Sequence, residues 1–362
     1  MASKEVQARH VFHAPVAGWD RIHAWQEATG EPAFVWGRNS GHVRGRLFRS
    51  IKRDFALWLE ATQSAPITIY HDGAGVDALG AMDANDHKIL FLHQFFPRWE
   101  RLFEWNIRMT GRLMVGHSSQ SAFVRERFGW IPERFILPVP QPVLKPEEEE
   151  SSGSGAGNRT GIWLHGLPWR RFGNRLRSII DRWPPEAGQL EIVVSGKGRP
   201  SWARKDHVVW SVDLPFQFAL YRLHTWDSTL LLNDYSLDAP WLMAALEMGC
   251  FPLVPEGDGA ARVGEWENDS APRPYPWGDV PGALQLLQEW RKSKEQLQPE
   301  FDTWRRNLFG AKRKGPEFLS LWQETKQTLL EQRPPKLRSR KPAGGWHPVR
   351  WYERIQRLRA GN

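Results

Sequence analysis

The sequence predicts an α/β protein made of two doubly wound, Rossmann-like domains that face a cleft. Three observations support this prediction. The chain has 362 residues, which is more than one hydrophobic core usually supports. Short apolar runs alternate with segments of helical spacing in both halves of the chain, and this pattern is typical of parallel βαβ units. The alternation is interrupted once, near residue 150, by a stretch with the composition of a linker.

The first domain should contain strands formed by short apolar or β-branched runs between turn-forming residues. These strands are expected at Val11–His13, Ala33–Trp36, Ile67–His71, Ile89–His93, Leu113–Gly116 and Phe135–Pro138. The segments between them have the apolar spacing of amphipathic helices. These helices are expected at Trp19–Ala28, Val43–Thr62, Trp99–Met109 and Ser119–Phe128. Right-handed connections would then distribute the helices over both faces of one parallel sheet.

The composition changes between Pro138 and Thr160, where prolines are followed by Glu147–Glu150 and then by the Ser/Gly-rich run Ser151–Gly157. A segment this polar cannot bury enough apolar surface to order itself. We therefore expect a first domain at residues 1–143 and a flexible linker at residues 144–160.

The alternation of strands and helices restarts after the linker. Strands are expected at Ile162–His165, Leu190–Ser195, Val208–Val212, Thr229–Leu232 and Phe251–Val254. Helices are expected at Gly173–Arg182, Phe216–Leu223, Trp241–Met248 and Ala283–Glu295, and a last amphipathic helix at about Glu317–Gln332. This gives a second domain at residues 161–315, a closing helix at 316–332 and a tail at 333–362.

The tail carries all of the net charge. Residues 333–362 contain nine Lys or Arg and one acid, Glu353, which is a net +8, equal to the formal charge of the whole chain. The remaining residues therefore sum to zero. A basic tail on a neutral body favours an anionic partner for the tail, such as a membrane surface, a nucleic acid or an acidic protein.

Composition also indicates the location of the protein and the chemistry available to it. No apolar run approaches the roughly 20 residues that span a bilayer, and Met1–Glu5 lacks the features of a signal peptide. We expect a cytoplasmic protein. The single cysteine, Cys250, begins an apolar strand, so it should be a small buried hydrophobe and no disulfide can form. No Asp-x-Asp pair and no cluster with metal-ligand spacing occurs, so we expect neither a metal nor a cofactor.

Two runs carry a resemblance to a known family. The first is Leu113–Val124 followed by Ile131–Pro138, which gives a strand, a serine, a helix and a second strand ending at proline. The second is the strand entry Gly249–Pro252 with the glycine-bearing loop Glu256–Gly259 behind it. With the two-domain layout, these runs resemble GT-B glycosyltransferases, in particular the large retaining bacterial family (glycosyl transferases group 1) that includes mannosyltransferases and sucrose-type synthases.

The resemblance implies a glycosyltransferase that moves a sugar from a nucleotide-sugar donor to a cell-envelope or exported glycan acceptor, with retention and without a metal. The C-terminal domain would bind the donor, the N-terminal domain would bind a glycan or lipid-linked acceptor, and the closing helix would return toward the N-terminal domain. The basic tail would meet an anionic membrane surface, at the inner face of the cytoplasmic membrane. No specific nucleic acid is expected.

The resemblance also suggests catalytic residues. His93 ends a predicted strand where similar enzymes carry a histidine beside the sugar, and His71 with Asp72 at the end of the preceding strand are rivals. The family's two glutamates correspond to Ser236 and Ala244, and neither is an acid. Asp238 is the substitute we prefer, because it precedes a helix and can face both the N-terminal N–H groups and a ligand.

Donor-binding residues should aim cations, backbone N–H groups or helix N-termini at the departing diphosphate. These residues are expected in the loops that follow the strands of the second domain and at one turn of the first. The set is Arg170, Arg171, Lys197, Ser236, Gly257, Gly259 and Gly18.

Two other functions remain open. The missing glutamates are compatible with a catalytically degenerate GT-B protein that binds a sugar or a partner. The basic tail is compatible with binding of nucleic acid, which would weaken steeply with salt. A histidine at a strand end is also often a structural residue whose hydrogen bonds are satisfied within the fold.

Overall fold

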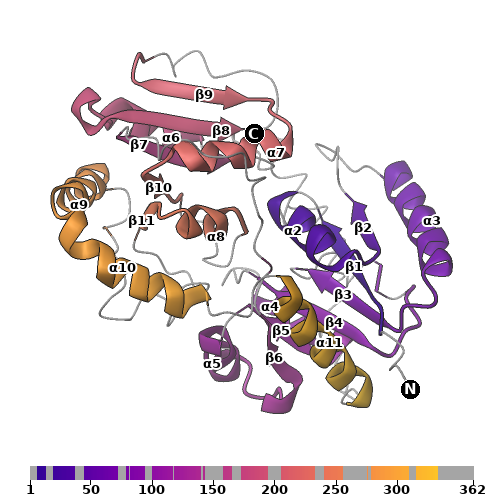
Figure 1. The fold of residues 1–362 in the computed structure, drawn as a ribbon. Helices are drawn as coiled ribbons and strands as arrows, with labels where there is room; N and C mark the ends of the chain where they lie inside the picture. The colour runs from indigo at the N-terminus through magenta and orange to yellow at the C-terminus, as the bar shows by residue number, and fades with distance from the viewer. Residues whose placement is uncertain are drawn as a thin grey trace. The chain divides into compact units, whose positions relative to one another are not determined.

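The computed structural model divides the chain into two compact units, each built on its own sheet (Figure 1). The first unit contains residues 1–17, 29–139 and 319–362, and the second contains residues 18–28 and 140–318. The structure describes residues 6–13, 19–36, 45–71, 79–80, 82–93, 100–116, 118–139, 142, 158–164, 173–194, 205–232, 240–255, 275, 279–309 and 315–332.

The first unit contains a parallel sheet of six strands in the order β2-β1-β3-β4-β5-β6. The strands are β1 (Ala8–His13), β2 (Ala33–Trp36), β3 (Ile67–His71), β4 (Lys88–Leu92), β5 (Leu113–Val115) and β6 (Ile136–Pro138). The strand order reverses direction between β1 and β3, because β2 pairs on one side of β1 and β3 on the other. In open α/β sheets, ligands bind beyond the carboxyl ends of the strands at such a reversal.

Helices cover both faces of this sheet. The helices of this unit that lie between its strands in sequence are α3 (Gly45–Ala61), α4 (Glu100–Thr110) and α5 (Ser118–Arg127). The helix α2 (Trp19–Thr29) follows β1 in sequence, but all of it except Thr29 belongs to the second unit. On one face, Phe34 of β2 packs edge-on against Phe55 of α3, with ring centroids 5.0 Å apart. On the other face, Trp322 of the last helix, α11 (Gly315–Glu331), lies against His10 of β1.

The second unit contains a parallel sheet of five strands in the order β11-β10-β7-β8-β9. The strands are β7 (Arg159–Leu164), β8 (Gln189–Val194), β9 (Val208–Val212), β10 (Ser228–Leu230) and β11 (Phe251–Leu253). Its helices include α6 (Gly173–Arg182), α7 (Phe216–Tyr221), α8 (Pro240–Glu247), α9 (Val280–Lys292) and α10 (Lys294–Phe309). Trp163 of β7 stacks on Trp241 of α8 in the core. The order of these strands reverses between β7 and β10.

The helix α11 is attached to the first unit along one stripe. Trp322, Lys326 and Leu329 are spaced four and three residues apart, so they lie on one side of the helix. The carbonyl oxygen of Leu329 accepts a hydrogen bond from Arg112 Nη1 at 2.6 Å, and His87 Nδ1 lies 3.1 Å from the same oxygen. Burial lowers the pKa of Arg112 to about 10. The C-terminal helix therefore returns to the N-terminal sheet.

Several elements differ from the sequence prediction. The strand predicted at Val11–His13 begins at Ala8, and the strand predicted at Ile162–His165 begins at Arg159, inside the segment expected to be a linker. The helix α10 was not predicted, because Pro299 interrupts its pattern and its composition is polar. Proline lacks the N–H of an interior helical position, yet α10 continues through it.

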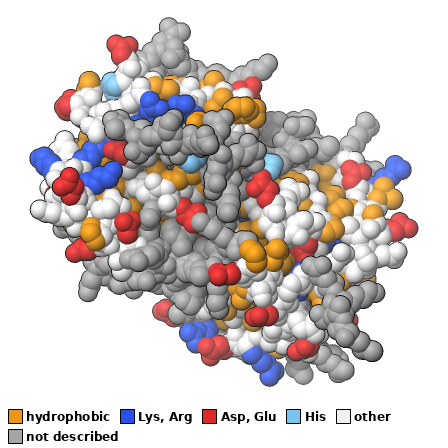
Figure 2. Space-filling model, in the orientation of Figure 1, with side chains coloured by type: hydrophobic (Ala, Val, Ile, Leu, Met, Phe, Trp, Pro, Cys, Tyr) orange, Lys and Arg blue, Asp and Glu red, His pale blue; other side chains and the backbone are white. Residues whose placement is uncertain are grey.

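The remaining observations concern composition. Cys250 is buried, as expected, and its Sγ lies 3.3 Å from the carbonyl oxygen of Trp226. Within the described part of the chain, no helix is both long enough and apolar enough to cross a membrane. On the face drawn in Figure 2, the described acidic and basic side chains are interspersed. The basic tail at 333–362 lies outside the described residues.

Candidate functional site

Three histidines lie on one face of the first sheet: His10 in β1, His71 in β3 and His93 directly after β4. Side chains alternate between the two faces along a strand. The register pairs His10 with Ile69 and His71 with Phe91, so His10, His71 and His93 all project from the same face. The three rings are buried, with exposures of 1%, 0% and 0%. His93 follows the carboxyl end of β4, which is where ligands bind in sheets of this kind.

The three imidazoles form a continuous hydrogen-bonded chain. His10 Nδ1 lies 3.0 Å from His71 Nε2, and His71 Nδ1 lies 2.8 Å from His93 Nε2. The rings of His71 and His93 are nearly parallel, with an interplanar angle of 10°. Phe12 stacks on His71 with a centroid distance of 4.0 Å. Apolar packing therefore fixes the planes of the rings, and the hydrogen bonds fix the rotation of each ring within its plane.

The inner end of this chain is Glu31, which follows the helix α2. Gly30 adopts a left-handed backbone conformation, with φ of 64°, and turns the chain after the helix. Glu31 Oε2 accepts hydrogen bonds from His10 Nε2 and Trp322 Nε1, both at 2.9 Å. Glu31 Oε1 accepts hydrogen bonds from Lys326 Nζ at 2.5 Å and from the backbone N–H of Ala8 at 3.1 Å. Four donors therefore surround one carboxylate.

The electrostatics of Glu31 follow from these contacts. Burial raises the pKa of Glu31, but the hydrogen bonds and positive charges of His10 and Lys326 outweigh burial and bring the pKa below its ordinary value. The carboxylate is ionised at neutral pH and can only accept hydrogen bonds. Lys326 is 2% exposed. The pair of Lys326 and Glu31 is therefore a buried, charge-balanced ion pair.

An ionised Glu31 fixes one proton position in the chain. His10 Nε2 must carry a proton, because its partner is a pure acceptor. If the imidazoles are neutral, His10 Nδ1 accepts from His71 Nε2–H, and His71 Nδ1 accepts from His93 Nε2–H. His93 Nδ1 is then a hydrogen-bond acceptor.

The arrangement is not that of a metal site. Each hydrogen bond uses a different nitrogen of His71, so the three rings are arranged in series and do not converge on one point. A metal needs ligand atoms directed at one centre. Within the residues that the structure describes, no His, Cys, Asp and Glu side chains form a group that could hold a metal ion.

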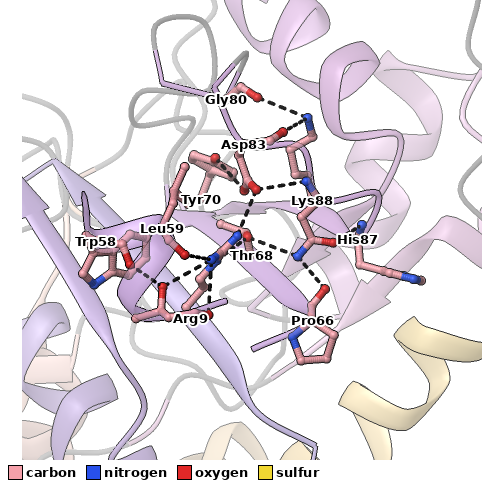
Figure 3. Close-up of polar contacts among 12 residues, drawn as sticks. Arg9, Trp58, Leu59, Pro66, Thr68, Tyr70, Gly80, Asp83, His87 and Lys88 are labelled. Atoms are coloured by element: carbon pink, nitrogen blue, oxygen red, sulfur yellow. Dashed lines mark hydrogen bonds and ion pairs between the residues drawn. The ribbon is translucent and has the colours of Figure 1, made fainter. Parts of the chain in front are cut away.

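The opposite face of the same strands carries a second buried polar network (Figure 3). Arg9 Nη2 forms an ion pair with Asp83 at 2.9 Å, and Arg9 Nε donates to Thr68 Oγ1 at 2.9 Å. Tyr70 donates its hydroxyl to Asp83 at 3.1 Å. Burial, followed by the charge and hydrogen bond of Asp83, raises the pKa of Tyr70, so its hydroxyl stays protonated.

This second network ties loops and helices to the sheet. Arg9 Nη1 donates to the carbonyl oxygens of Leu59 and Thr62, near the end of α3, and its guanidinium lies 5.7 Å from the ring centroid of Trp58. Lys88 Nζ donates to the carbonyl oxygens of Gly80 and Asp83. Among the described residues, these contacts join structural elements, and none of them is made to His10, His71 or His93.

Only one of the predicted site residues lies within the described residues, and it is His93. The two alternatives to His93 have different outcomes. His71 is the hydrogen-bond partner of His93, and Asp72 lies outside the described residues. The other predicted site residues also lie outside them. These are Asp238, Arg170, Arg171, Lys197, Ser236, Gly257, Gly259 and Gly18.

The second sheet has a comparable reversal between β7 and β10. Their carboxyl ends are Leu164 and Leu230, and α8 follows β10 from Pro240. Ala244, at the position of one family glutamate, is fully buried in the hydrophobic core with its neighbour Ala245. This alanine therefore packs the helix against the core and offers no polar group.

Sequence reasoning did not find Glu31, His10, Trp322 or Lys326. No alternation marks His10 either, because the polar residues of the strand Ala8–His13 are Arg9, His10 and His13. Glu31 lies in a short connection, and Lys326 is 295 residues away from it along the chain. Their proximity depends on where α11 packs, which no local pattern records.

Comparisons with known proteins show the fold alone. No protein-family model matches the sequence, and no curated protein matches it. The structure is similar to sucrose-phosphate synthase from Thermosynechococcus elongatus, with a TM-score of 0.57 and 9% identity over 90% of this chain and 100% of that chain. It is also similar to the catalytic domain of starch synthase IV from Arabidopsis thaliana bound to ADP and acarbose, with a TM-score of 0.54 and 11% identity over 91% and 100%.

A third similar structure is S. aureus TarM in complex with UDP and glycan ligands, with a TM-score of 0.50 and 12% identity over 76% of this chain. The chain spans 59% of the length of that TarM protein. The three proteins are GT-B glycosyltransferases, and the two parallel-sheet units match theirs. The chain therefore has the GT-B fold.

Proposed function

We propose that the protein is a glycosyltransferase that moves a sugar from a nucleotide-sugar donor to a cell-envelope or exported glycan acceptor. The observation that supports this most directly is a GT-B fold in which a buried, oriented histidine, His93, follows the carboxyl end of β4. Similar folds belong to proteins bound to UDP or to ADP with a sugar-like ligand. The proposal extends that chemistry to this chain.

In this proposal, the second unit binds the nucleotide beyond the ends of β7 and β10, where its strand order reverses. Arg170, Arg171 and Lys197 neutralise the diphosphate as it departs, Ser236, Gly257, Gly259 and Gly18 contact the donor, and no metal is needed. Asp238, two residues before α8, contacts the donor at the helix N-terminus. His93 is hydrogen-bonded to a sugar hydroxyl. Transfer with retention is part of the proposal.

The proposed setting is cytoplasmic, with the basic tail drawn to an anionic membrane surface at its inner face. Nine cations against one acid in residues 333–362 support this part of the proposal, since juxtamembrane basic clusters add about 1 kcal/mol of binding free energy per Lys or Arg. A lipid-linked acceptor would fit the same surface.

The test is a donor-hydrolysis screen of the purified protein with UDP-, GDP- and ADP-sugars. The wild type is compared with Asp238→Ala and with the control Asp181→Ala, which removes a half-exposed carboxylate of α6. Turnover of one donor that is lost in Asp238→Ala and kept in Asp181→Ala is the expected result. Absence of binding of every nucleoside diphosphate to the folded protein, measured by calorimetry, would contradict the proposal.

A second candidate is a GT-B protein that binds a sugar or partner without catalysis. The burial of Ala244 in the core favours it, because a position that carries a carboxylate in similar enzymes is apolar here. The same screen separates the two candidates. Nucleotide binding without donor turnover would support the degenerate protein.

A further inference from the structure

The C-terminal end of α11 is attached to the first sheet at a cluster of three polar groups. Arg112 Nη1 lies 2.6 Å from the carbonyl oxygen of Leu329 and 3.0 Å from His87 Nδ1, and His87 Nδ1 lies 3.1 Å from the same oxygen. Arg112 directly precedes β5 and His87 directly precedes β4, so both lie at the edge where these strands begin. The cluster therefore joins α11 to two neighbouring strands.

The guanidinium of Arg112 is a buried cation that touches no carboxylate of the described residues. Its side chain is fully buried, and its polar contacts within the described part of the chain are the carbonyl oxygen of Leu329 and the ring of His87. Its Nε and Nη2 atoms are buried without a hydrogen-bond partner among those residues. Burial lowers the pKa of Arg112 to about 10, so the guanidinium is still charged at neutral pH. A second positive charge beside it is unfavourable.

The position of the proton on neutral His87 follows from this neighbour. A guanidinium only donates hydrogen bonds, so His87 Nδ1 can bond to Arg112 only as an unprotonated acceptor. The two hydrogens of Nη1 then serve the carbonyl oxygen of Leu329 and the ring of His87. His87 is half-buried, so its ring remains within reach of protons from the solvent.

Protonation of His87 disturbs this arrangement. An imidazolium donates from both nitrogens, so His87 Nδ1 would face another donor, and two cations would lie within hydrogen-bond distance. The protonated ring can still donate to the carbonyl oxygen of Leu329, but that bond keeps the two cations together. Separation of α11 from the sheet lets water reach both groups and weakens their repulsion.

The other charged groups near this cluster are paired or exposed. On α11, Lys326 pairs with Glu31, and Glu331 is exposed. Beside His87 in the sequence, Asp86 is exposed, and Lys88 Nζ donates to two backbone carbonyl oxygens. The strand β3 contacts His87 through a backbone hydrogen bond. Within the described residues, the charged group in contact with the ring of His87 is therefore Arg112.

We propose that His87, Arg112 and the carbonyl oxygen of Leu329 form an acid-sensitive latch that attaches α11 to the sheet. At neutral pH, His87 accepts a hydrogen bond from Arg112, and the latch is closed. In acid, protonated His87 repels Arg112, and the last turns of α11 separate from the sheet. The basic tail at 333–362 follows these turns directly in sequence. The latch does not depend on the proposed function, because neither a donor nor an acceptor takes part in it.

The test is amide hydrogen exchange of the full chain at pH 7.5 and pH 5.5, measured by mass spectrometry on peptides that cover residues 319–332. Protection factors, corrected for the intrinsic effect of pH on exchange, report the opening of α11. An unconstrained histidine, with a pKa of about 6.5, takes up a proton over this range. Uptake linked to opening should lower the protection of α11 about tenfold at pH 5.5. Equal protection at both pH values would overturn the proposal.

Two variants make the test specific to the latch. His87→Gln presents an amide oxygen to Arg112 and does not titrate, so its protection should be equal at both pH values. Arg112→Met removes the opposing cation, so acid should no longer lower the protection, although His87 still titrates. The control is His207→Gln, which removes a histidine directly before β9 in the second unit. This control should keep the tenfold fall of the wild type.

The variants also give the results that would contradict the latch. A tenfold fall that persists in folded His87→Gln would assign the effect to another group, such as His10 beside Glu31, and would overturn the proposal. A fall that persists in Arg112→Met would overturn it as well, because repulsion by the guanidinium would not be the cause. If Arg112→Met does not fold, the wild type and His87→Gln still decide. A protein that hydrolyses no donor but shows these pH effects would refute the proposed function and leave the latch intact.

Discussion

The two faces of the first sheet carry buried polar networks made from neighbouring residues of the same strands. Arg9 and Tyr70 project to one face, and His10 and His71, the next residues along each strand, project to the other. The Arg9 network joins β1, β3 and the end of α3, and all of its partners are structural. The histidine chain ends at the carboxyl edge of the sheet. Alternation along a strand thus separates a structural network from the one for which we propose a functional role.

The largest expected effect is on the face of the Arg9 network. Removal of Asp83 should cause the largest loss of stability. Asp83→Ala leaves the guanidinium of Arg9 buried without its carboxylate, since their side chains are 6% and 1% exposed. Loss of one partner of a buried pair costs about 3–5 kcal/mol of unfolding free energy. We expect this loss in urea unfolding, with donor turnover of the folded protein unchanged.

The control for this prediction is Asp86→Ala, three residues along the same connection. Asp86 is exposed, so its removal should change the unfolding free energy by less than about 0.5 kcal/mol. The Asp83→Ala variant could instead keep wild-type stability, or lose turnover while fully folded. Either result would contradict the assignment of a structural role to the Arg9 face and a functional role to the histidine face.

The second prediction concerns the histidine face. His71→Phe keeps the stacking on Phe12 but removes the partners of His10 Nδ1 and His93 Nε2. Leaving these buried groups unpaired should lower the unfolding free energy by about 2–4 kcal/mol. Donor turnover should fall roughly tenfold to a hundredfold. This fall in the turnover of His71→Phe therefore exceeds the fall that its loss of stability alone would produce.

The matched control is His87→Phe, which removes a histidine near the opposite end of β4. His87 contacts Arg112 and the carbonyl oxygen of Leu329, so its loss should reduce stability without affecting turnover. Equal turnover in His71→Phe and His87→Phe would show that the chain through His71 has no role in the site.

Much of the fold was predictable from the sequence, for a physical reason. Strands buried on both faces are short apolar runs, and β3, at Ile67–His71, has the predicted limits. The prediction failed where burial was achieved by pairing of polar groups. β1 was expected to start at Val11 and starts at Ala8, because Arg9 and His10 look exposed in sequence but are satisfied by partners far along the chain.

The candidate site was predictable to a smaller extent. The strand-end position of His93 followed from the pattern, but His71 was expected to be its rival and is its hydrogen-bond partner. That relation depends on β3 and β4 being adjacent and on their register. The position of Lys326 beside Glu31 depends on the packing of α11. These are tertiary facts, so a local pattern cannot contain them.

The third prediction extends the comparison to the second sheet. Glu191 of β8 accepts hydrogen bonds from Arg222 at 2.7 Å and from Trp226 Nε1 at 3.0 Å. A Cβ on Gly161, its neighbour across the sheet, would lie 2.0 Å from the Trp226 ring. Gly161→Ala must displace this ring, and overpacking of this kind costs about 1–3 kcal/mol.

Urea unfolding measures this cost, with Gly173→Ala as the control. A Cβ on Gly173 meets no atom within 4 Å, so this change in α6 should be neutral or stabilise by up to about 1 kcal/mol. The Glu191 network resembles the Arg9 network in being structural, so donor turnover should stay unchanged in Gly161→Ala. A loss of turnover would show that this network also reaches a ligand.

The smallest expected effect is a pH dependence of the unfolding free energy that arises from Glu31. The hydrogen bonds and charges of His10 and Lys326 hold the pKa of Glu31 below its ordinary value in the fold, against the effect of burial. The unfolded value is about 4.3. Ionised Glu31 therefore stabilises the fold fully above that pH, and the stabilisation is lost as the pH falls through the lower folded pKa.

The measurement is the difference in unfolding free energy between the wild type and Glu31→Gln from pH 7 to pH 3. This difference should be constant at neutral pH and should narrow in acid, by a fraction of what the substitution costs at pH 7. Glu104→Gln, which alters a half-exposed pair with Arg108, serves as the surface reference. A difference that does not narrow would mean that the carboxylate is not held by His10 and Lys326. The chain of three histidines would then lack an ionised acceptor at its inner end, and the two faces of the sheet would no longer differ in the way that their hydrogen bonds indicate.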